Sequence, residues 1–500
     1  MRITPNTPRR ERTDNKDRRD IRSFYHLAGA GETGEFCQGT ACFVARLLNP
    51  GRWRAATSQE HRVYCLGSCF VAPASSSEVS RPRMAIRSRE PIVLGPMLEG
   101  PISSISTSVA RGSYRALEEA LNRPPTELVS SIEASGLRGR GGAGFSTGKK
   151  WRAVAEQKGP EKFVVANADE GDPGAYIDRF LLEDDPHRLL EAMAIAGYAV
   201  GATQSYIYLR KEYPHARIVL ERALLEARQE GFLGKRILRS DFSFDVELII
   251  GQGSYVCGEE TALLNSIEGR RPEVRLRPPY PSEYGLLGKP TLINNVETLA
   301  NIPWIVRNSA DAFRRLGFSK SRGTKVLSLN SLFRNPGLYE VEFGMSIRDI
   351  VGDLGGGLKA GTAKGVIVGG PLAGIIPPHL FDTPLGFEEL ARIGASVGHG
   401  GVIAFDEHAS IAELIHHVFE FAAYESCGKC TPCRLGSRRI EQMFRQIVKA
   451  GCVPAQEKKE CMEVVSALAM TSLCGLGTGL AEFAQSALRH YAEELEPCFR

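Results

Sequence analysis

Four cysteines late in the chain have the spacing of an iron–sulfur ligand set. Cys427, Cys430 and Cys433 form a C-x2-C-x2-C run, and Cys474 follows after 40 further residues. Three thiolates on one short loop can bind three irons of a [4Fe–4S] cluster while a fourth arrives from elsewhere. Zinc is the alternative, although structural zinc sites prefer two separated pairs. Buried free thiols would not need three cysteines within seven residues, so the spacing predicts a [4Fe–4S] cluster.

A second group of cysteines lies near the beginning of the sequence. Cys37 and Cys42 form one close pair, and Cys65 and Cys69 form another after a gap of 22 residues. Two close pairs suit a [2Fe–2S] cluster with two ligands on each iron; a zinc site or vestigial thiols remain open. A disulfide framework is disfavoured, because the charged residues 1–22 do not resemble a secretory signal.

A glycine-rich loop covers residues 136–145. Gly139, Gly141 and Gly144 match G-x-G-x-x-G, but a Rossmann fold needs a strand directly before such a loop. Residues 127–135 have a helical pattern instead, so that fold is disfavoured. Glycines still allow close approach of a phosphate or flat ring, and their N–H groups form an anion nest. With Lys149 or Lys150 adding positive charge, the loop predicts a binding site rather than a flexible surface loop.

Three polar clusters follow, at residues 167–175, 255–260 and 290–298. The first comes directly after a predicted strand at 162–166, and carboxylates at such a strand end usually lie at the mouth of a ligand-binding cleft. A turn that caps a helix is the alternative. In the third cluster, Asn294 and Asn295 can donate to and accept from the edge of a heteroaromatic ring. Each cluster is ambiguous alone.

The elements that must position these residues divide the chain into several domains, as expected for 500 residues. Charged residues make up 24% and the net charge is only +4, which indicates a globular protein and argues against nucleic-acid binding. No run of about 18 apolar residues predicts a membrane span. We expect a disordered tail over 1–23, a small unit over 24–95, an α/β domain over 110–305, a β-rich domain over 322–405 and a helical domain over 410–500.

Together these motifs resemble the flavin-containing, NADH-binding 51-kDa-type subunit of respiratory complex I and its soluble relatives. Those relatives are the diaphorase subunits of NAD-reducing hydrogenases and NAD-dependent formate dehydrogenases. The resemblance covers residues 110–490 and implies a multidomain α/β fold. It adds a thioredoxin-like ferredoxin module over 24–95, an FMN- and NADH-binding α/β domain, a β-grasp domain of the SLBB type over 322–405, and a C-terminal helical bundle with a [4Fe–4S] cluster.

The resemblance also implies which residues contact each ligand. Those expected to approach FMN are Gly139, Arg140, Gly141, Lys150, Asn167, Asp169, Tyr255, Gly258, Glu259, Asn294, Asn295 and Thr298. Those expected to face NADH are Gly142, Ala143, Phe145, Glu170, Asp172, Glu260 and Tyr280. No side chain is expected to be catalytic, because the flavin itself accepts and releases the hydride.

The implied activity is that of an FMN-dependent NADH:acceptor oxidoreductase in the cytoplasm. A flavin converts between the hydride of NAD(H) and the single electrons of iron–sulfur clusters. The form of residues 169–175 and the fused N-terminal module favour a formate dehydrogenase complex, with a 24-kDa-type [2Fe–2S] subunit and a large molybdenum or tungsten subunit as partners. A hydrogenase complex and respiratory complex I are alternatives, as is a zinc-bound or nucleotide-sensing module without catalysis. Neither nucleic acid nor direct membrane insertion is expected.

Overall fold

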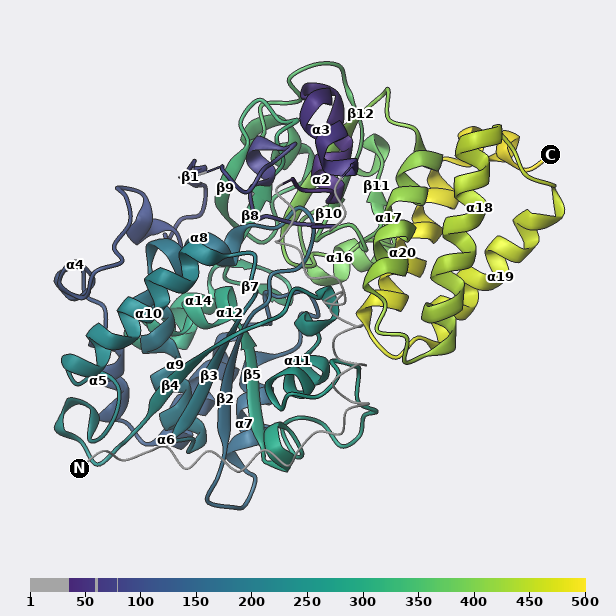
Figure 1. The fold of residues 1–500 in the computed structure, drawn as a ribbon. Coiled ribbons are helices and arrows are strands. Elements are labelled where there is room, and N and C mark those ends of the chain that lie inside the picture. The colour runs from purple at the N-terminus through teal and green to yellow at the C-terminus, as the bar shows by residue number, and fades with distance from the viewer. Residues whose placement is uncertain (1–35, 59–61, 79) are drawn as a thin grey trace.

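The computed structural model describes residues 36–58, 62–78 and 80–500, which form two large sheets, a two-stranded sheet and a block of helices (Figure 1). The tail predicted for residues 1–23 lies outside this part of the chain. The α/β fold and the C-terminal helical region predicted from the sequence are confirmed.

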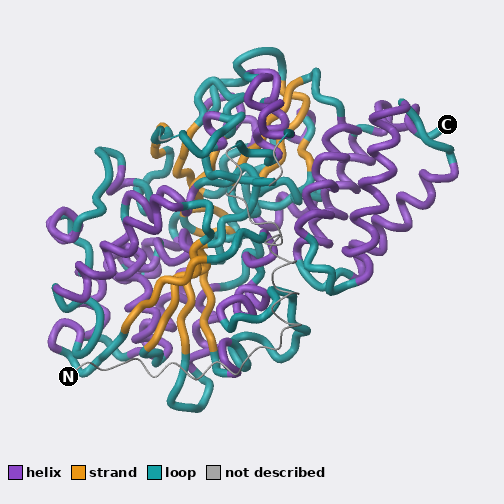
Figure 2. The backbone as a smooth tube through the Cα atoms, viewed as in Figure 1, coloured by secondary structure: helices purple, strands orange, loops and turns teal. Residues whose placement is uncertain are grey.

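The first sheet contains four parallel strands in the order β4-β3-β2-β5. Figure 2 shows them as a fan of neighbouring strands. Their bounds are Phe163–Ala168 (β2), Gln204–Leu209 (β3), Asp245–Ile250 (β4) and Thr291–Asn295 (β5). Because the chain moves outward from β2 to β4 and then returns to the other side of β2, the order reverses between β2 and β5. Ligands bind outside the carboxyl ends of strands at such a reversal.

Both faces of this sheet are covered, which explains the nearly continuous apolar sequence of β2. Val164 and Ala166 pack in the main core with helix α9 (Pro186–Val200), whereas Phe163 and Val165 pack on the opposite face with helix α11 (Glu260–Ile267). Successive side chains of a strand point to opposite faces, so one apolar run serves both layers. Because the side chains of β2 itself pack on both faces, the polar residues that follow it lie at the carboxyl end of the strand.

The second sheet has six strands in the order β1-β9-β8-β12-β10-β11. Five of them come from one region: Thr324–Leu329 (β8), Gly337–Glu342 (β9), Ala363–Val368 (β10), Ile375–Ile376 (β11) and Gly401–Asp406 (β12). This agrees with the β-rich region predicted over 322–405, while its assignment to the SLBB type stays a prediction. The sixth strand, β1 (Arg83–Ile86), comes from the N-terminal segment and pairs in parallel with β9.

The N-terminal segment therefore differs from the expected thioredoxin-like module. Within the described part of residues 36–95, β1 is the only strand, and it belongs to the sheet of a later region. The stretch 91–94 is a loop because the buried carboxylate of Glu340 accepts hydrogen bonds from the backbone N–H groups of Ile92, Val93 and Leu94. Residues 62–65 contribute one isolated bridge, between Val63 and Cys37.

The C-terminal region is built from α17 (Ile411–Glu425), α18 (Ser437–Ala450), α19 (Gln456–Thr471), α20 (Gly475–His490) and the short α21 (Ala492–Leu495). The first four pack side by side at one end of the molecule (Figure 1). In α18, Ile440, Phe444 and Ile447 are buried at helical spacing, so one face of the helix packs against its neighbours. Among the described helices, none is both long and apolar enough to cross a bilayer.

Candidate functional site

A cavity of about 390 Å³ lies where the carboxyl end of the parallel sheet meets the other two regions. Cavities of roughly 300–1,000 Å³ are typical of sites for small molecules and cofactors. The glycine loop, the turn after β2, the segment 255–259 and Asn295 form one side. The loops at 369–373 and 396–399 and the first residues of α20 form the other. The site therefore unites residues more than 300 positions apart in sequence.

The glycine loop presents bare backbone to the cavity. It leads from α6 (Pro125–Ser135) into α7 (Thr147–Ala155), whose N-cap Ser146 accepts the N–H of Lys149. Gly142 has φ +130°, and a Cβ atom there would extend into open space. The same glycine forms an isolated bridge with Gly398 of the six-stranded region. The loop is thus held against the opposite wall, and its bare backbone allows a phosphate or a flat ring to approach closely.

The turn after β2 supplies carboxylates to the cavity wall. Asn167 donates to the carbonyl of Gly258 at 2.8 Å and accepts the N–H of Asp169 at 3.1 Å, which joins this turn to the 255–259 segment. Among the described residues, Oδ2 of Asp169 has no hydrogen-bond partner although it is buried. Burial raises the pKa of Asp169 well above its usual value. An unpartnered acceptor of this kind fits the hydroxyl or ring N–H donors of a flavin.

The neighbouring Asp172 is already bonded. The hydroxyl of Tyr255 donates to its Oδ1 at 2.7 Å. Burial raises the pKa of Asp172, while the charge of His399 and the bond from Tyr255 oppose the increase. Tyr255 is in turn fixed through its N–H, which donates to Glu425 at the end of α17. These contacts connect the cavity wall to the helical region.

The four C-terminal cysteines converge beside the cavity, and Cys474 is part of its lining. Burial raises the pKa of Cys433 to about 12, and the charges of Cys430, Cys474 and Cys427 also act to raise it. The other three thiols are therefore close enough to Cys433 to act on it electrostatically. Cys427 and Cys474 additionally pack with Val256, which lines the cavity. A donor set of four converging cysteines fits a [4Fe–4S] cluster.

The N-terminal cysteines also converge, on the far side of the turn after β2. Cys65 and Cys69 have Sγ atoms 3.8 Å apart, the thiol of Cys42 accepts the N–H of Ala74 and is acted on by the charge of Cys37, and all four are nearly inaccessible. The Sγ of Cys65 also lies 3.8 Å from the carbonyl oxygen of Ala175. Two pairs of thiols buried together fit a [2Fe–2S] cluster with two ligands on each iron.

The structure brings about half of the sequence-predicted ligand residues to the cavity. Those that line it are Gly141, Gly142, Ala143, Asn167, Asp169, Asp172, Tyr255, Gly258, Glu259 and Asn295. Those that do not are Gly139, Arg140, Phe145, Lys150, Glu170, Glu260, Tyr280, Asn294 and Thr298.

Several of the second group have other partners. The buried guanidinium of Arg140 donates to the carbonyls of Arg138 and Arg322, and its backbone N–H donates to Thr298. Asn294 accepts from the indole of Trp151 at 3.0 Å. These side chains support the glycine loop and β5 from behind the cavity.

Four other residues of that group form a charged and aromatic rim outside the cavity: Phe145, Lys150, Glu260 and Tyr280. Glu260 forms ion pairs with Lys150 at 3.1 Å and Arg277 at 3.0 Å. Burial opposes the shift, but these two cations lower the pKa of Glu260 below its usual value. Phe145 and Tyr280 are 56% and 53% exposed, which leaves both rings open to a flat partner.

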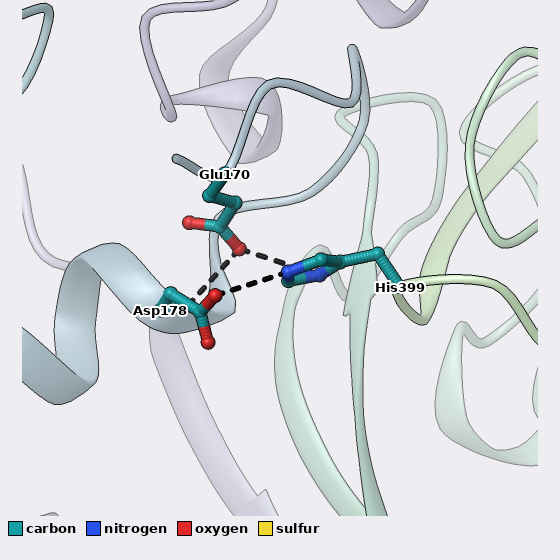
Figure 3. Close-up of side chains that lie close together, drawn as sticks. All are labelled: Glu170, Asp178 and His399. Atoms are coloured by element: carbon teal, nitrogen blue, oxygen red, sulfur yellow. Dashed lines mark hydrogen bonds and ion pairs between the residues drawn. The ribbon is translucent and has the colours of Figure 1, made fainter. Parts of the chain in front are cut away.

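The structure also adds residues that the sequence patterns did not identify. Asp178 and His399 line the cavity, and with Glu170 they form a buried cluster shown in Figure 3. His399 stands among Gly398, Gly400 and Gly401, a local signal that could have marked it. Nothing in the sequence around Asp178 distinguishes it. The remaining lining residues missed are Gly171, Val256, Gly369, Leu372, Ala373, Ser396, Gly398, Gly475, Leu476, Thr478, Gly479 and Glu482.

A flavin-sized cavity whose wall includes an iron–sulfur ligand defines a flavoprotein electron-transfer subunit. Comparisons with known proteins give the family. The model described as the Nuo51 FMN-binding domain matches residues 132–304, and the NADH-ubiquinone oxidoreductase-F iron-sulfur binding region matches 413–498. The chain belongs to the family of these 51-kDa NADH-binding subunits, with FMN, a [4Fe–4S] cluster and NAD(H) as its ligands.

Individual relatives agree with this assignment. The chain is 43% identical to the HndC subunit of the NADP-reducing hydrogenase of Solidesulfovibrio fructosivorans, over 79% of this chain and 80% of the relative. It is 42% identical to the F 2 subunit of NADH-quinone oxidoreductase of Rhizobium meliloti (strain 1021), over 78% and 93%. A crystal structure of an NAD+-reducing [NiFe]-hydrogenase in the H2-reduced state matches with a TM-score of 0.81 and 29% identity, covering 97% of this chain and 87% of that chain.

Proposed function

We propose that the protein is a diaphorase subunit that exchanges hydride between NAD(H) and FMN and passes single electrons to a partner catalytic subunit. The observation that carries this proposal is the position of Cys474. It lines the same cavity as the glycine loop and Asp169, so one wall serves both the flavin and the cluster. FMN supplies the conversion between two-electron and one-electron chemistry.

The chain's own residues bind, orient and shield the cofactor. The backbone of Gly141 and Gly142 approaches the flavin, and Asp169 accepts a hydrogen bond from it. Val256, Leu372 and Leu476 provide apolar surface in the lining and exclude water from the hydride. No general base is required for hydride transfer, so the carboxylates of this site act by positioning and by electrostatics.

NAD(H) approaches from the side of Phe145, Tyr280 and Glu260. The exposed rings are available to stack on flat groups, and Glu260 is held ionised beside Lys150 and Arg277. A carboxylate fixed in this way accepts hydrogen bonds from ribose hydroxyls or the carboxamide. We assign it to NAD(H) rather than FMN because it lies outside the cavity lining.

The N-terminal cysteines bind a [2Fe–2S] cluster behind the flavin cavity. Arg210 supports this position because its guanidinium donates to the carbonyls of both Cys65 and Glu170, which joins the cysteine segment to the turn after β2. Electrons from FMN would then have a second acceptor opposite the [4Fe–4S] cluster.

The terminal partner is a molybdenum- or tungsten-containing formate dehydrogenase subunit, in a cytoplasmic complex that also holds a 24-kDa-type subunit. The form of residues 169–175 supports this choice. A hydrogenase is the second candidate, favoured by the structural match to an NAD+-reducing [NiFe]-hydrogenase over 97% of the chain. The intact complex separates them: formate-dependent reduction of NAD+ supports the first, and reduction of NAD+ with hydrogen alone supports the second.

The placement of FMN is tested at Asp169. Replacing it by Asn puts an NH2 donor in the place of a carboxyl oxygen, and a buried polar group left without its partner costs roughly 1–3 kcal/mol. Asp169→Asn should therefore weaken FMN binding by about ten- to a hundredfold, since each 1.4 kcal/mol is about tenfold. Released FMN is measured by fluorescence after heating, with exposed Asp353→Asn as the control. Full FMN content in Asp169→Asn and unchanged affinity would place the flavin elsewhere.

A further inference from the structure

The buried cluster of Glu170, Asp178 and His399 has a geometry that fixes the protonation of its histidine. The Nε2 of His399 lies 3.1 Å from Oδ2 of Asp178, and its Nδ1 lies 3.5 Å from Oε1 of Glu170 (Figure 3). Both ring nitrogens therefore face carboxylate oxygens. Nε2 is hydrogen-bonded to Asp178, whereas Nδ1 forms no hydrogen bond with any described residue and approaches Glu170 only as a charge contact, so a protonated ring would place its positive charge between two carboxylates.

The surrounding charges favour the same state. Glu170, Asp178 and Asp172 face the imidazole from the turn after β2 and from α8 (Ile177–Asp184), and Lys325 faces it from β8. Lys325 is paired with the buried Glu297. If His399 were neutral, buried negative charge would exceed buried positive charge around it. Uncompensated charge is costly in a low-dielectric interior. Burial alone lowers the pKa of His399, but the charges of Asp178 and Glu170 outweigh it and raise the pKa to about 9.

The carboxylates are fully bonded, which argues against a metal ion as the occupant of the cluster. Glu170 accepts the N–H groups of Ile177, Asp178 and Arg179 and the hydroxyl of Tyr213. Asp178 accepts from Asn295, from the N–H of Glu297 and from His399. A divalent cation would have to displace these donors, since it needs the same lone pairs.

His399 lies where its positive charge can act on a ligand in the cavity. His399 and Asp178 both line the cavity, and the backbone bridge between Gly398 and Gly142 fixes the histidine relative to the glycine loop. A Cβ atom on Gly398 would lie 2.1 Å from the carbonyl oxygen of Gly369, so the backbones on either side are in close contact. The backbone that carries His399 is therefore fixed against the loop of Gly369 at the edge of the cavity.

We propose that His399 provides a fixed positive charge in the wall of the FMN cavity, and that this charge makes the protein bind reduced flavin more tightly than oxidised flavin. The reason is that hydride transfer from NADH yields NAD+ and adds one negative charge to the flavin. A cation fixed in a dry wall stabilises that added charge without reorganising. This inference rests on the proposed placement of FMN, and His399 lies well beyond the 132–304 segment matched by the FMN-binding family model.

The midpoint potential of the bound flavin tests this role. His399→Gln removes the charge and keeps hydrogen-bonding capacity. We expect the preference for reduced over oxidised FMN to fall by at least about tenfold, which lowers the potential of a two-electron couple by about 30 mV. His416→Gln is the matched control, because His416 also pairs with a carboxylate, Glu441 at 3.1 Å, but on α17. An unchanged potential in His399→Gln with full FMN content would overturn the inference while leaving the proposed function intact.

A second measurement needs no variant. Reduction should raise the pKa of His399 further, so the wild-type potential should fall more steeply with pH in a window that begins near pH 9. His399→Gln should lack this window. A wild-type potential with no change of slope between pH 8 and about 10.5 would contradict the proposal. A stoichiometric metal other than iron that disappears in His399→Gln would also overturn it, in favour of a metal site.

Discussion

Glu260 shows how the surroundings of one side chain decide what it can bind. Its carboxylate lies between Lys150 and Arg277, which keep it ionised and fixed at the edge of the site. The two cations leave it lone pairs for a ligand, whereas the buried Glu170 uses its oxygens on backbone N–H groups and Tyr213. The sequence assigned both glutamates to the NADH side of the site. Only the structure shows that Glu260 is available to a ligand and that Glu170 is not.

The role of Glu260 can be measured directly. Glu260→Gln should weaken NADH use by about ten- to a hundredfold, because a charged hydrogen bond of roughly 1.5–3 kcal/mol is lost. FMN content should hardly change, since Glu260 lies outside the cavity lining. The assay is NADH oxidation linked to ferricyanide, with flavin measured on the same sample and exposed Glu247→Gln as the control. Flavin loss in step with activity would show that Glu260 supports FMN instead.

At the scale of elements, the loop that carries Cys427, Cys430 and Cys433 is bonded near its start to the flavin-binding region. Lys429 pairs with Glu273 at 3.0 Å, and the guanidinium of Arg271 donates to the carbonyl of Cys427 at 3.3 Å. The start of α20 places Cys474 in the cavity wall. Loop and helix are thus held by contacts that do not require the cluster itself.

Removal of a single ligand should therefore affect the cluster and spare the flavin. Cys430 is the ligand to change, because it does not line the cavity. Cys430→Ser should abolish one reducible signal in electron paramagnetic resonance while FMN content stays at the wild-type level. Cys452→Ser, at an exposed cysteine between α18 and α19, is the control. A spectrum identical to wild type would reject this cysteine set as the cluster site.

For the molecule as a whole, the N-terminal cysteines are inseparable from the rest of the fold. Their segment continues into β1, which pairs with β9, and α2 (Thr40–Val44) packs on α17 through a stack of Phe43 on His417 at 4.3 Å. A fragment covering only residues 24–95 would lose all these contacts. The [2Fe–2S] proposal must therefore be tested in the full chain.

In the full chain, Cys42→Ser should remove a second reducible signal and about two irons and two sulfides, because the close pairs each hold one iron. The signal of the [4Fe–4S] cluster should remain, since its predicted ligands lie in a different segment of the chain. Iron and sulfide analysis together with electron paramagnetic resonance distinguishes the outcomes. Equal iron content in Cys42→Ser and wild type would mean that these thiols hold no cluster.

What the sequence could predict depended on local spacing. The Cys427–Cys433 run, the glycine loop after a helix and the strand ending in Asn167 and Asp169 were recognisable because each lies within a few residues. The place of β1 beside β9 was not predictable, since a four-residue strand carries no mark of a partner 250 residues away. His399 had a local signal in its flanking glycines, but its partners Asp178 and Glu170 approach it only in three dimensions, so its role was not predictable.

The pairing of β1 with β9 has a consequence for how the protein is made. Residues 83–86 leave the ribosome long before residues 337–342, so β1 has no partner during the synthesis of some 250 residues. The cysteine segment before it likewise lacks the surface of α17, which begins at Ile411. Contacts so distant in sequence form slowly. The segment that carries the first four cysteines should therefore be among the last to dock, so a [2Fe–2S] cluster bound by Cys37, Cys42, Cys65 and Cys69 would be completed late in folding.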